Sequence, residues 1–489
     1  MAAKHRYSII LFIVFITGLL IRYFMIQLDP YLHHWDEHFH ALVAKNMLEH
    51  PFKPTMIEYP IIPYKVSCWN GNYVWLHKPP LFLWQMAISL KFLGCTEVAV
   101  RMPSLIMTSL SILLLYRITF LTTGNNKTAL LAGILMCFSY YQFQLISGRY
   151  STDHNDVAFG FYVLASIWAY MEYLKKLTWK WVILVGLFAG CAILNKWLTG
   201  LLVYSAWGIQ ASLDYYSKRE KRNIVRLIVS IVVCAAVFVP WQIYIYRAFP
   251  VEARFENDFN NRHLWEALEE NTGSVFFYLA HYDEYYGLLT SLLFLFGILA
   301  KKSKSFNKQI GNTLLTFFFI VLFFFSFLVK TKMMSFIYCV LPIGYVFAAV
   351  ALERLYQMIG NKWIFSAVLV IILINTARPY DVWKATRHSA SRNKKIANTK
   401  ILKTADEIVP PNINVVMNLG NDENIDLMFY NKRKITAYPG FISEENMNLL
   451  EKTKTPVAVF MSHGKYVLPP YVTAYPYLYI IPQLLKDPD

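Results

Sequence analysis

Long apolar runs alternate with short polar connectors over most of this chain. Eleven runs stand out, at 8–28, 103–121, 128–146, 156–174, 181–195, 198–214, 224–247, 286–300, 311–329, 335–352 and 363–377. Most of them approach the roughly 20 apolar residues that cross the hydrocarbon of a bilayer as a helix. The pattern therefore predicts an α-helical polytopic membrane protein with about 11–13 transmembrane helices.

The pattern changes after residue 377. An amphipathic helix is expected at 394–409, strands at 413–420, 455–461 and 472–481, and helical stretches at 422–430 and 442–453. No glycine-rich phosphate-binding signature accompanies them. The sequence thus predicts a transmembrane domain over 1–377 and a small extracytoplasmic α/β domain over 378–489.

The segment 78–94 leaves two topologies open, because its apolar run is short for a crossing and Lys91 interrupts its end. If the segment crosses, 147–156 faces the cytoplasm and the basic connector 217–223 faces outward, against the positive-inside rule. If it lies at the interface as an amphipathic helix, all the basic connectors are cytoplasmic. We favour the second arrangement, with eleven crossings and external loops at 29–102 and 248–285.

Composition supports a multi-pass protein of the cell membrane, which would be the inner membrane in a bacterium. The chain is 56% hydrophobic, whereas soluble domains are usually about 45–50% apolar. The net charge of +16 comes largely from connectors such as 217–223 and 301–308. Positive charge in short cytoplasmic loops needs no nucleic acid to explain it, so we exclude a nucleic-acid partner.

The predicted topology collects polar residues at the outer face. They are Asp36, Glu37, Lys78, Arg149, Lys196, Lys330 and Lys332. Ionisable groups at membrane depth are costly and usually functional. A carboxylate such as Asp36 or Glu37 can take a proton from an acceptor, and the lysines and arginine can neutralise a leaving phosphate. Outside the cell a donor has to arrive attached to lipid, so the pattern favours group transfer from a polyprenyl phosphate.

Six motifs carry a resemblance to a known family. They are "WDEHFHALVAKNML" (35–48), "WNGNYVWLHKPPLFLW" (69–84), "EVAVRMPSL" (97–105), "SGRYSTDHNDVAFGF" (147–161), "AILNKWLTGLL" (192–202) and "KTKMMSFIYCVLP" (330–342). In this order they resemble the GT-C glycosyltransferases, in the protein mannosyltransferase-like branch that includes the lipid A aminoarabinose transferase. The similarity covers roughly residues 1–350.

The resemblance implies an inverting glycosyltransferase that takes a sugar from a polyprenyl phosphate, undecaprenyl phosphate in bacteria. It gives Asp36 the role of general base, Glu37 that of its partner, and Lys78 a contact to the donor phosphate. In the motif at 147–161 the corresponding aspartate is either Asp153, which fits the spacing to Arg149, or Asp156, which fits the spacing to Phe161. The acceptor is a lipid, a glycan or a protein, on the periplasmic or exterior side.

The last motif departs from the family pattern. Met334 stands where the family often has proline, and Phe336 where it has tyrosine; Tyr338 is a candidate replacement. His154 and His263 are further candidates for substrate binding. We expect no required cofactor and no metal, since His263, His281 and Glu58 show no ligand spacing.

Two other classes of function remain as alternatives. One is a transporter or flippase of a lipid-linked or polar substrate, although no repeat is visible and the ionisable residues avoid the bilayer midplane. The other is a scaffold that binds a polyprenyl phosphate and a partner enzyme.

Overall fold

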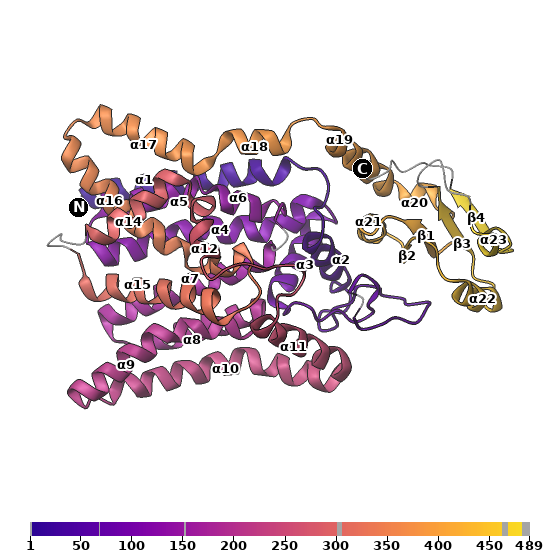
Figure 1. Cartoon of the computed structure of the whole chain (residues 1–489), viewed down its shortest axis with the longest axis horizontal. Helices are drawn as coiled ribbons and strands as arrows, with labels where there is room; N and C mark the ends of the chain where they lie inside the picture. Colours follow the sequence, from indigo (N-terminus) through magenta and orange to yellow (C-terminus); the bar gives the residue numbers. More distant parts are fainter. Residues whose placement is uncertain (1, 68, 151–152, 301–305, 462–467, 482–489) are drawn as a thin grey trace.

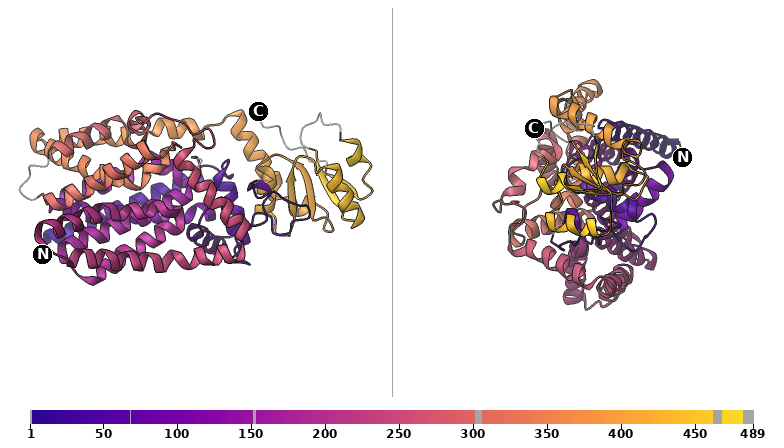
Figure 2. Two further views of the ribbon diagram at one scale, coloured as in Figure 1. Left: turned by 60° about the horizontal axis from the view of Figure 1, so that its bottom comes forward. Right: turned by 90° about the vertical axis from the view of Figure 1, so that its right-hand side faces the viewer.

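A helical bundle and a smaller α/β part lie end to end (Figure 1). This computed structural model describes residues 2–67, 69–150, 153–300, 306–461 and 468–481. The N-terminus lies at the end of the bundle that is remote from the sheet, and two further views show the same arrangement (Figure 2).

Within the described residues, eight helical segments are long and apolar enough to cross a membrane. Five of them are single helices, α1 (Ala2–Gln27), α4 (Glu97–Thr123), α7 (His154–Lys176), α8 (Trp179–Lys196) and α10 (Arg222–Ala248), and a sixth contains α17 (Lys362–Ala377). Three of the eight segments are composite: α15 (Lys308–Phe323) continues into the π-helical η3 (Phe324–Leu328), the 3-10 turns of η4 (Met334–Val340) continue into α16 (Leu341–Ile359), and α17 continues into α18 (Pro379–Thr386). The predicted polytopic helical fold is confirmed.

Three of the eleven predicted spans are not among these eight segments. The run at 128–146 forms α5 (Asn126–Cys137) and α6 (Tyr140–Ile146), bent by 49°, and counting this pair as one span gives nine. The runs at 198–214 and 286–300 correspond to α9 (Tyr204–Lys218), which follows the 3-10 turns of η2 (Trp197–Val203), and to α14 (Leu288–Leu299). Both helices have fewer than 18 residues.

Three shorter helices gather at the end of the bundle that faces the sheet: α2 (Asp36–Asn46), α3 (Leu81–Leu93) and α11 (Pro250–Trp265) (Figure 1). The 13 residues of α3 extend only about 20 Å at 1.5 Å per residue, short of the roughly 30 Å of hydrocarbon. The Ser89 hydroxyl donates to the carbonyl of Ala99, 2.6 Å away, so α3 packs beside the start of α4. This length agrees with the interfacial alternative for 78–94.

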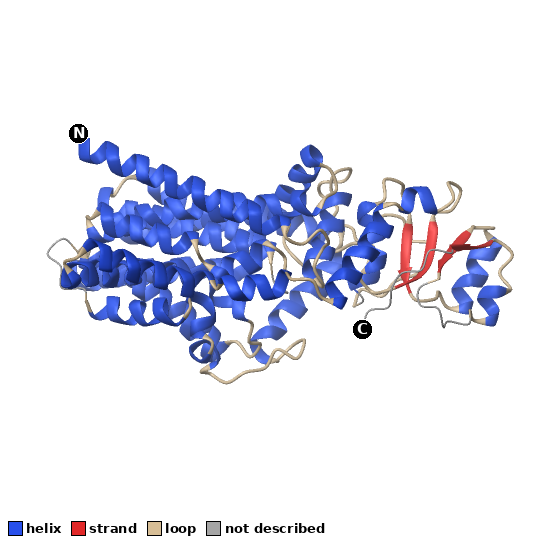
Figure 3. Ribbon diagram, turned by 90° about the horizontal axis from the view of Figure 1, so that it is seen from above, coloured by secondary structure: helices blue, strands red, loops and turns tan. Residues whose placement is uncertain are grey.

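The C-terminal part contains a four-stranded parallel sheet in the order β2-β1-β3-β4. Figure 3 shows its strands in red, at the end of the molecule away from the bundle. Its strands are β1 (Val415–Leu419), β2 (Thr436–Pro439), β3 (Val457–Phe460) and β4 (Leu478–Ile481), and α21 (Glu423–Tyr430), α22 (Glu444–Lys452) and α23 (Pro470–Thr473) lie between them. The expected strand at 472–481 begins only at Leu478, because α23 occupies 470–473. The sequence interpretation also missed β2, which has four residues and ends in a proline.

The α/β part packs against α2. His38 of α2 lies 2.7 Å from Asp426 of α21, measured between Nδ1 and Oδ1, and both side chains are buried. The Lys45 ammonium donates to the carbonyl of Met428 at 2.6 Å. Lys403, the last residue of α19 (Ala390–Lys403), pairs with Glu97 of α4 at 2.6 Å. The α/β part therefore contacts the same end of the bundle as the predicted site.

Candidate active site

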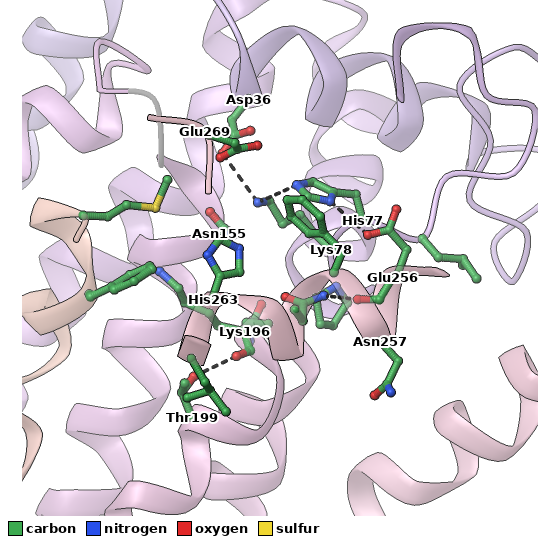
Figure 4. Close-up of a pocket in the computed structure, with 18 of the residues that line it drawn as sticks. Asp36, His77, Lys78, Asn155, Lys196, Thr199, Glu256, Asn257, His263 and Glu269 are labelled. Carbon is green, nitrogen blue, oxygen red and sulfur yellow. Dashed lines mark hydrogen bonds and ion pairs between the residues drawn. The ribbon is translucent and has the colours of Figure 1, made fainter. Parts of the chain in front are cut away.

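A cavity of about 750 Å³ opens at this end of the bundle. Its polar wall combines residues from six separate segments of the chain, including Asp36, His77, Lys78, Asn155, Asn195, Lys196, Thr199, Glu256, Asn257, His263 and Glu269 (Figure 4). Its apolar wall includes Trp241 and Ile245 of α10 and Phe324, Phe325 and Phe336 beyond the end of α15. The cavity is thus amphipathic, as a site for a lipid-linked polar group requires.

Asp36 is the first residue of α2 and lines the cavity. The residue before it, Trp35, has φ 68°, an unusual conformation for a residue other than glycine, and its exposed side chain also lines the cavity. The Asp36 carboxylate lies 3.8 Å from the Lys78 ammonium and keeps 15% of its side chain exposed. It is therefore a reachable carboxylate beside a cation.

Two lysines supply positive charge to the cavity. Burial alone would lower the pKa of Lys78, but Asp36, Glu269 and Asp156 outweigh it and raise that pKa. Lys196, at the end of α8, forms an ion pair with Asp156 and lies 4.8 Å from the centre of the Phe336 ring. Both lysines can therefore face an anionic group inside the cavity.

Glu37 does not line the cavity, although it directly follows Asp36. Its carboxylate is fully buried and accepts two hydrogen bonds from Arg101, at 2.7 and 3.0 Å, and one from the backbone N–H of His33 at 2.6 Å. Burial would raise the pKa of Glu37, but Arg101 and His154 hold it well below its ordinary value. A Cβ at Gly148 would come within 2.3 Å of this carboxylate, so only glycine fits there.

The two aspartates of the motif at 147–161 have different partners. Asp153 precedes α7, is fully buried and accepts a hydrogen bond from His40 Nδ1 at 3.0 Å. Asp156 is also fully buried but pairs with Lys196, which lines the cavity. His154 lies between Glu37 and Ser104, outside the lining. Of the two alternatives, Asp156 is the one that acts directly on a cavity residue.

Four further candidates lie outside the cavity lining. Arg149 pairs with Asp29 at 2.8 Å, and Lys330 is exposed. The Lys332 ammonium donates to backbone carbonyls at the end of η3, including that of Ser326 at 2.9 Å. Tyr338 is buried against Gly160 of α7. The structure therefore brings Lys78 and Lys196 together, but not the other three predicted phosphate-binding cations.

His263 lines the cavity from α11, and its Nδ1 lies 2.9 Å from the Thr331 hydroxyl. Burial, helped by the charge of Lys78, lowers the pKa of His263 to about 4. This histidine is therefore neutral at physiological pH. The other conceivable metal ligands lie elsewhere: Glu58 is beside Glu49 and Lys434, and His281 follows α12 (Phe277–Ala280).

The sequence interpretation missed the contribution of α11. It treated 248–285 as an acidic loop, whereas Glu256, Asn260 and His263 share one face of this helix and line the cavity. Their i, i+4, i+7 spacing is the signal that could have indicated this face. The sequence interpretation did not select His77, because it assigned the role in this motif to the adjacent Lys78.

Comparisons with known proteins agree with this architecture. Residues 77–244 match the family described as dolichyl-phosphate-mannose-protein mannosyltransferase. A curated uncharacterized protein of Aquifex aeolicus is 26% identical over 170 residues, which is 34% of this chain; the match spans only 30% of that relative's length.

Solved structures extend the likeness to most of the chain. ArnT from Cupriavidus metallidurans bound to undecaprenyl phosphate is 15% identical, with a TM-score of 0.64 and coverage of 91% of this chain and 89% of that one. AglB from Archaeoglobus fulgidus, in complex with an inhibitory peptide and a dolichol-phosphate, is 13% identical, with a TM-score of 0.58 and coverage of 90% and 65%. The chain therefore has the fold of the GT-C membrane glycosyltransferases, and the resemblance drawn from its motifs is confirmed.

Proposed function

We propose that this protein is an inverting glycosyltransferase that moves a sugar from a polyprenyl phosphate to a lipid, glycan or protein acceptor at the outer face of the membrane. One observation carries the proposal: a reachable carboxylate, Asp36, lies 3.8 Å from Lys78 in an amphipathic cavity. The fold shared with a structure that binds undecaprenyl phosphate supports the donor class.

The donor is an amphiphile, and the cavity offers a surface for each part of it. Its phosphate would bind between the ammonium groups of Lys78 and Lys196, which both line the cavity. The first isoprene units would contact the aromatic side chains of Phe324 and Phe325. The sugar would then lie toward Asp36, where the acceptor enters.

The transfer proceeds by a single displacement. Asp36 takes the proton of the acceptor hydroxyl or amine as the acceptor atom forms its bond to the anomeric carbon. The bond from that carbon to the phosphate oxygen breaks, and the electron pair leaves with the polyprenyl phosphate. Attack opposite the leaving group inverts the anomeric configuration. Lys78 and Lys196 neutralise the negative charge that develops on the phosphate.

Asp36→Asn tests this mechanism. In proteoliposomes supplied with a labelled polyprenyl-phosphate sugar and membrane acceptors, the variant should lose about 10²–10⁴-fold in transfer rate, the usual contribution of a general base. The matched control is Asp258→Asn, because Asp258 is exposed on α11 and does not line the cavity. That control should keep wild-type activity.

Full activity of Asp36→Asn would overturn the mechanism. If the wild-type protein moved label across the vesicle wall without forming a new glycosidic bond, the proposed function itself would fail in favour of transport.

A further inference from the structure

A chain of polar contacts crosses the cavity wall from α11 to α2 (Figure 4). Glu256 Oε2 lies 3.1 Å from His77 Nδ1, and His77 Nε2 lies 3.1 Å from the Lys78 ammonium. Lys78 in turn lies 3.8 Å from Asp36. His77 and Glu256 are nearly buried, with 12% and 8% of their side chains exposed. All four residues line the cavity.

The chemistry of these groups sets the direction of each hydrogen bond. A lysine ammonium has only donors, so His77 Nε2 presents its lone pair to Lys78. An ionised carboxylate only accepts, so His77 Nδ1 carries the hydrogen and donates to Glu256. One neutral tautomer of His77 satisfies both contacts. The carboxylate of Glu256 selects this tautomer by accepting at Nδ1.

Glu256 is itself held firmly. Its second oxygen, Oε1, accepts from the indole N–H of Trp69 at 2.9 Å, and its backbone carbonyl accepts from the Asn260 amide at 2.7 Å. The rings of Trp69 and His77 are 4.3 Å apart between centroids. Glu256 therefore fixes both the hydrogen position and the orientation of the His77 ring relative to α11.

We propose that Glu256 and His77 are positioning residues that hold the Lys78 ammonium at the donor phosphate and away from full pairing with Asp36. At 3.8 Å the Lys78–Asp36 contact is an ion pair without a hydrogen bond. Within the described residues, the His77 lone pair is the closest side-chain acceptor found for this ammonium. Without the His77 acceptor, the Lys78 ammonium would turn toward the Asp36 carboxylate. The general base and the cation that binds the phosphate would then neutralise each other. The proposal rests on the proposed function, because it takes Lys78 as a ligand of the donor phosphate.

A pair of substitutions at His77 separates positioning from packing. The amide of glutamine reaches the place of Nε2, so His77→Gln keeps an acceptor for Lys78 but loses the contact with Glu256. The amide of asparagine reaches the place of Nδ1, so His77→Asn keeps the contact with Glu256 but gives Lys78 no acceptor. If His77 served only to anchor the loop on α11, the asparagine variant would be the milder one.

We expect the opposite order. His77→Asn should raise the KM for the labelled polyprenyl-phosphate sugar by about tenfold, the effect of one lost hydrogen bond to a charged group. His77→Gln should stay within about threefold of wild type. The KM for the acceptor should change in neither variant. Glu256→Gln should raise the donor KM and have no further effect when combined with His77→Gln. His388→Asn, an exposed histidine far along the chain, is the control.

A double-mutant cycle with Lys78→Ala keeps failure of this inference apart from failure of the proposed function. If His77 acts through Lys78, His77→Asn adds nothing in the Lys78→Ala background. A donor KM that rises with Lys78→Ala but not with His77→Asn would overturn only the positioning role. A donor KM unaffected by Lys78→Ala would overturn the donor-binding role on which the inference rests.

Discussion

Two adjacent carboxylates, Asp36 and Glu37, have opposite environments. The sequence identified the pair as important, but it could not separate the two roles. Successive residues on a helix point about 100° apart, and here one direction leads to the cavity and the other to Arg101 of α4. That ion pair joins residues 64 positions apart, a separation over which no local pattern operates. The same limit applies to Asp153 and Asp156, whose partners His40 and Lys196 are set by tertiary packing.

Substitution at Glu37 should therefore affect folding rather than chemistry. Glu37→Gln leaves the Arg101 guanidinium buried without its counter-charge, which typically costs about 3–5 kcal/mol of folding free energy. Thermal unfolding of the purified protein in detergent should show a lower midpoint for Glu37→Gln and an unchanged one for Asp36→Asn. Equal midpoints for the two variants would refute the division of roles drawn from the structure.

At the scale of elements, most of the features that the sequence patterns did not predict lie at helix ends. The apolar runs predicted the bundle because burial in lipid leaves a strong periodic signal. The sequence predicted that Lys330 and Lys332 of "KTK" bind phosphate, but the Lys332 ammonium donates to carbonyls at the end of η3. This role of Lys332 as a donor to the helix end depends on where the π-helical turn ends, and no residue type predicts that position. The helix α11 was overlooked because its polar composition resembles that of a loop.

The short helix α3 supports a prediction about topology. If α3 lies at the interface, His50→Cys in the loop before α3 and Lys221→Cys in the basic connector are on opposite sides of the membrane, whereas a crossing α3 would place both on the same side. In a background without native cysteines, a membrane-impermeant thiol reagent applied to sealed, oriented vesicles should label only one of the two variants from a given side. Labelling of both from the same side would mean that α3 crosses the membrane, and the assignment of the outer face would fail.

On the scale of the whole molecule, the α/β part packs against the end of the bundle that contains the cavity. It contacts α2, the helix that begins with Asp36, through the His38–Asp426 pair, and it contacts α4 through Glu97. The sequence predicted most of its elements, because short buried strands between amphipathic helices leave a clear local pattern. It could not predict the docking, since His38 and Asp426 are 388 residues apart. The position of α2, and with it that of Asp36, therefore depends on this contact.

The docking should weaken as the pH rises. Burial would lower the pKa of His38, but Asp426 and Asp422 outweigh it and raise that pKa. Burial also raises the pKa of Asp426, in spite of His38. Both shifts mean that the docked state binds protons more readily than the separated one. The contribution of His38 is complete below its ordinary value of 6.5 and is lost as the pH rises through its raised pKa, and that of Asp426 is lost as the pH rises from its ordinary value of 3.8. Hydrogen exchange in α21, corrected for intrinsic rates, should show protection that falls as the pH rises above 6.5, the ordinary histidine value. His38→Gln should flatten this dependence, whereas the exposed control His388→Gln should keep it. Protection that grows with pH, or an unchanged slope in His38→Gln, would show that the buried pair does not hold the α/β part on α2.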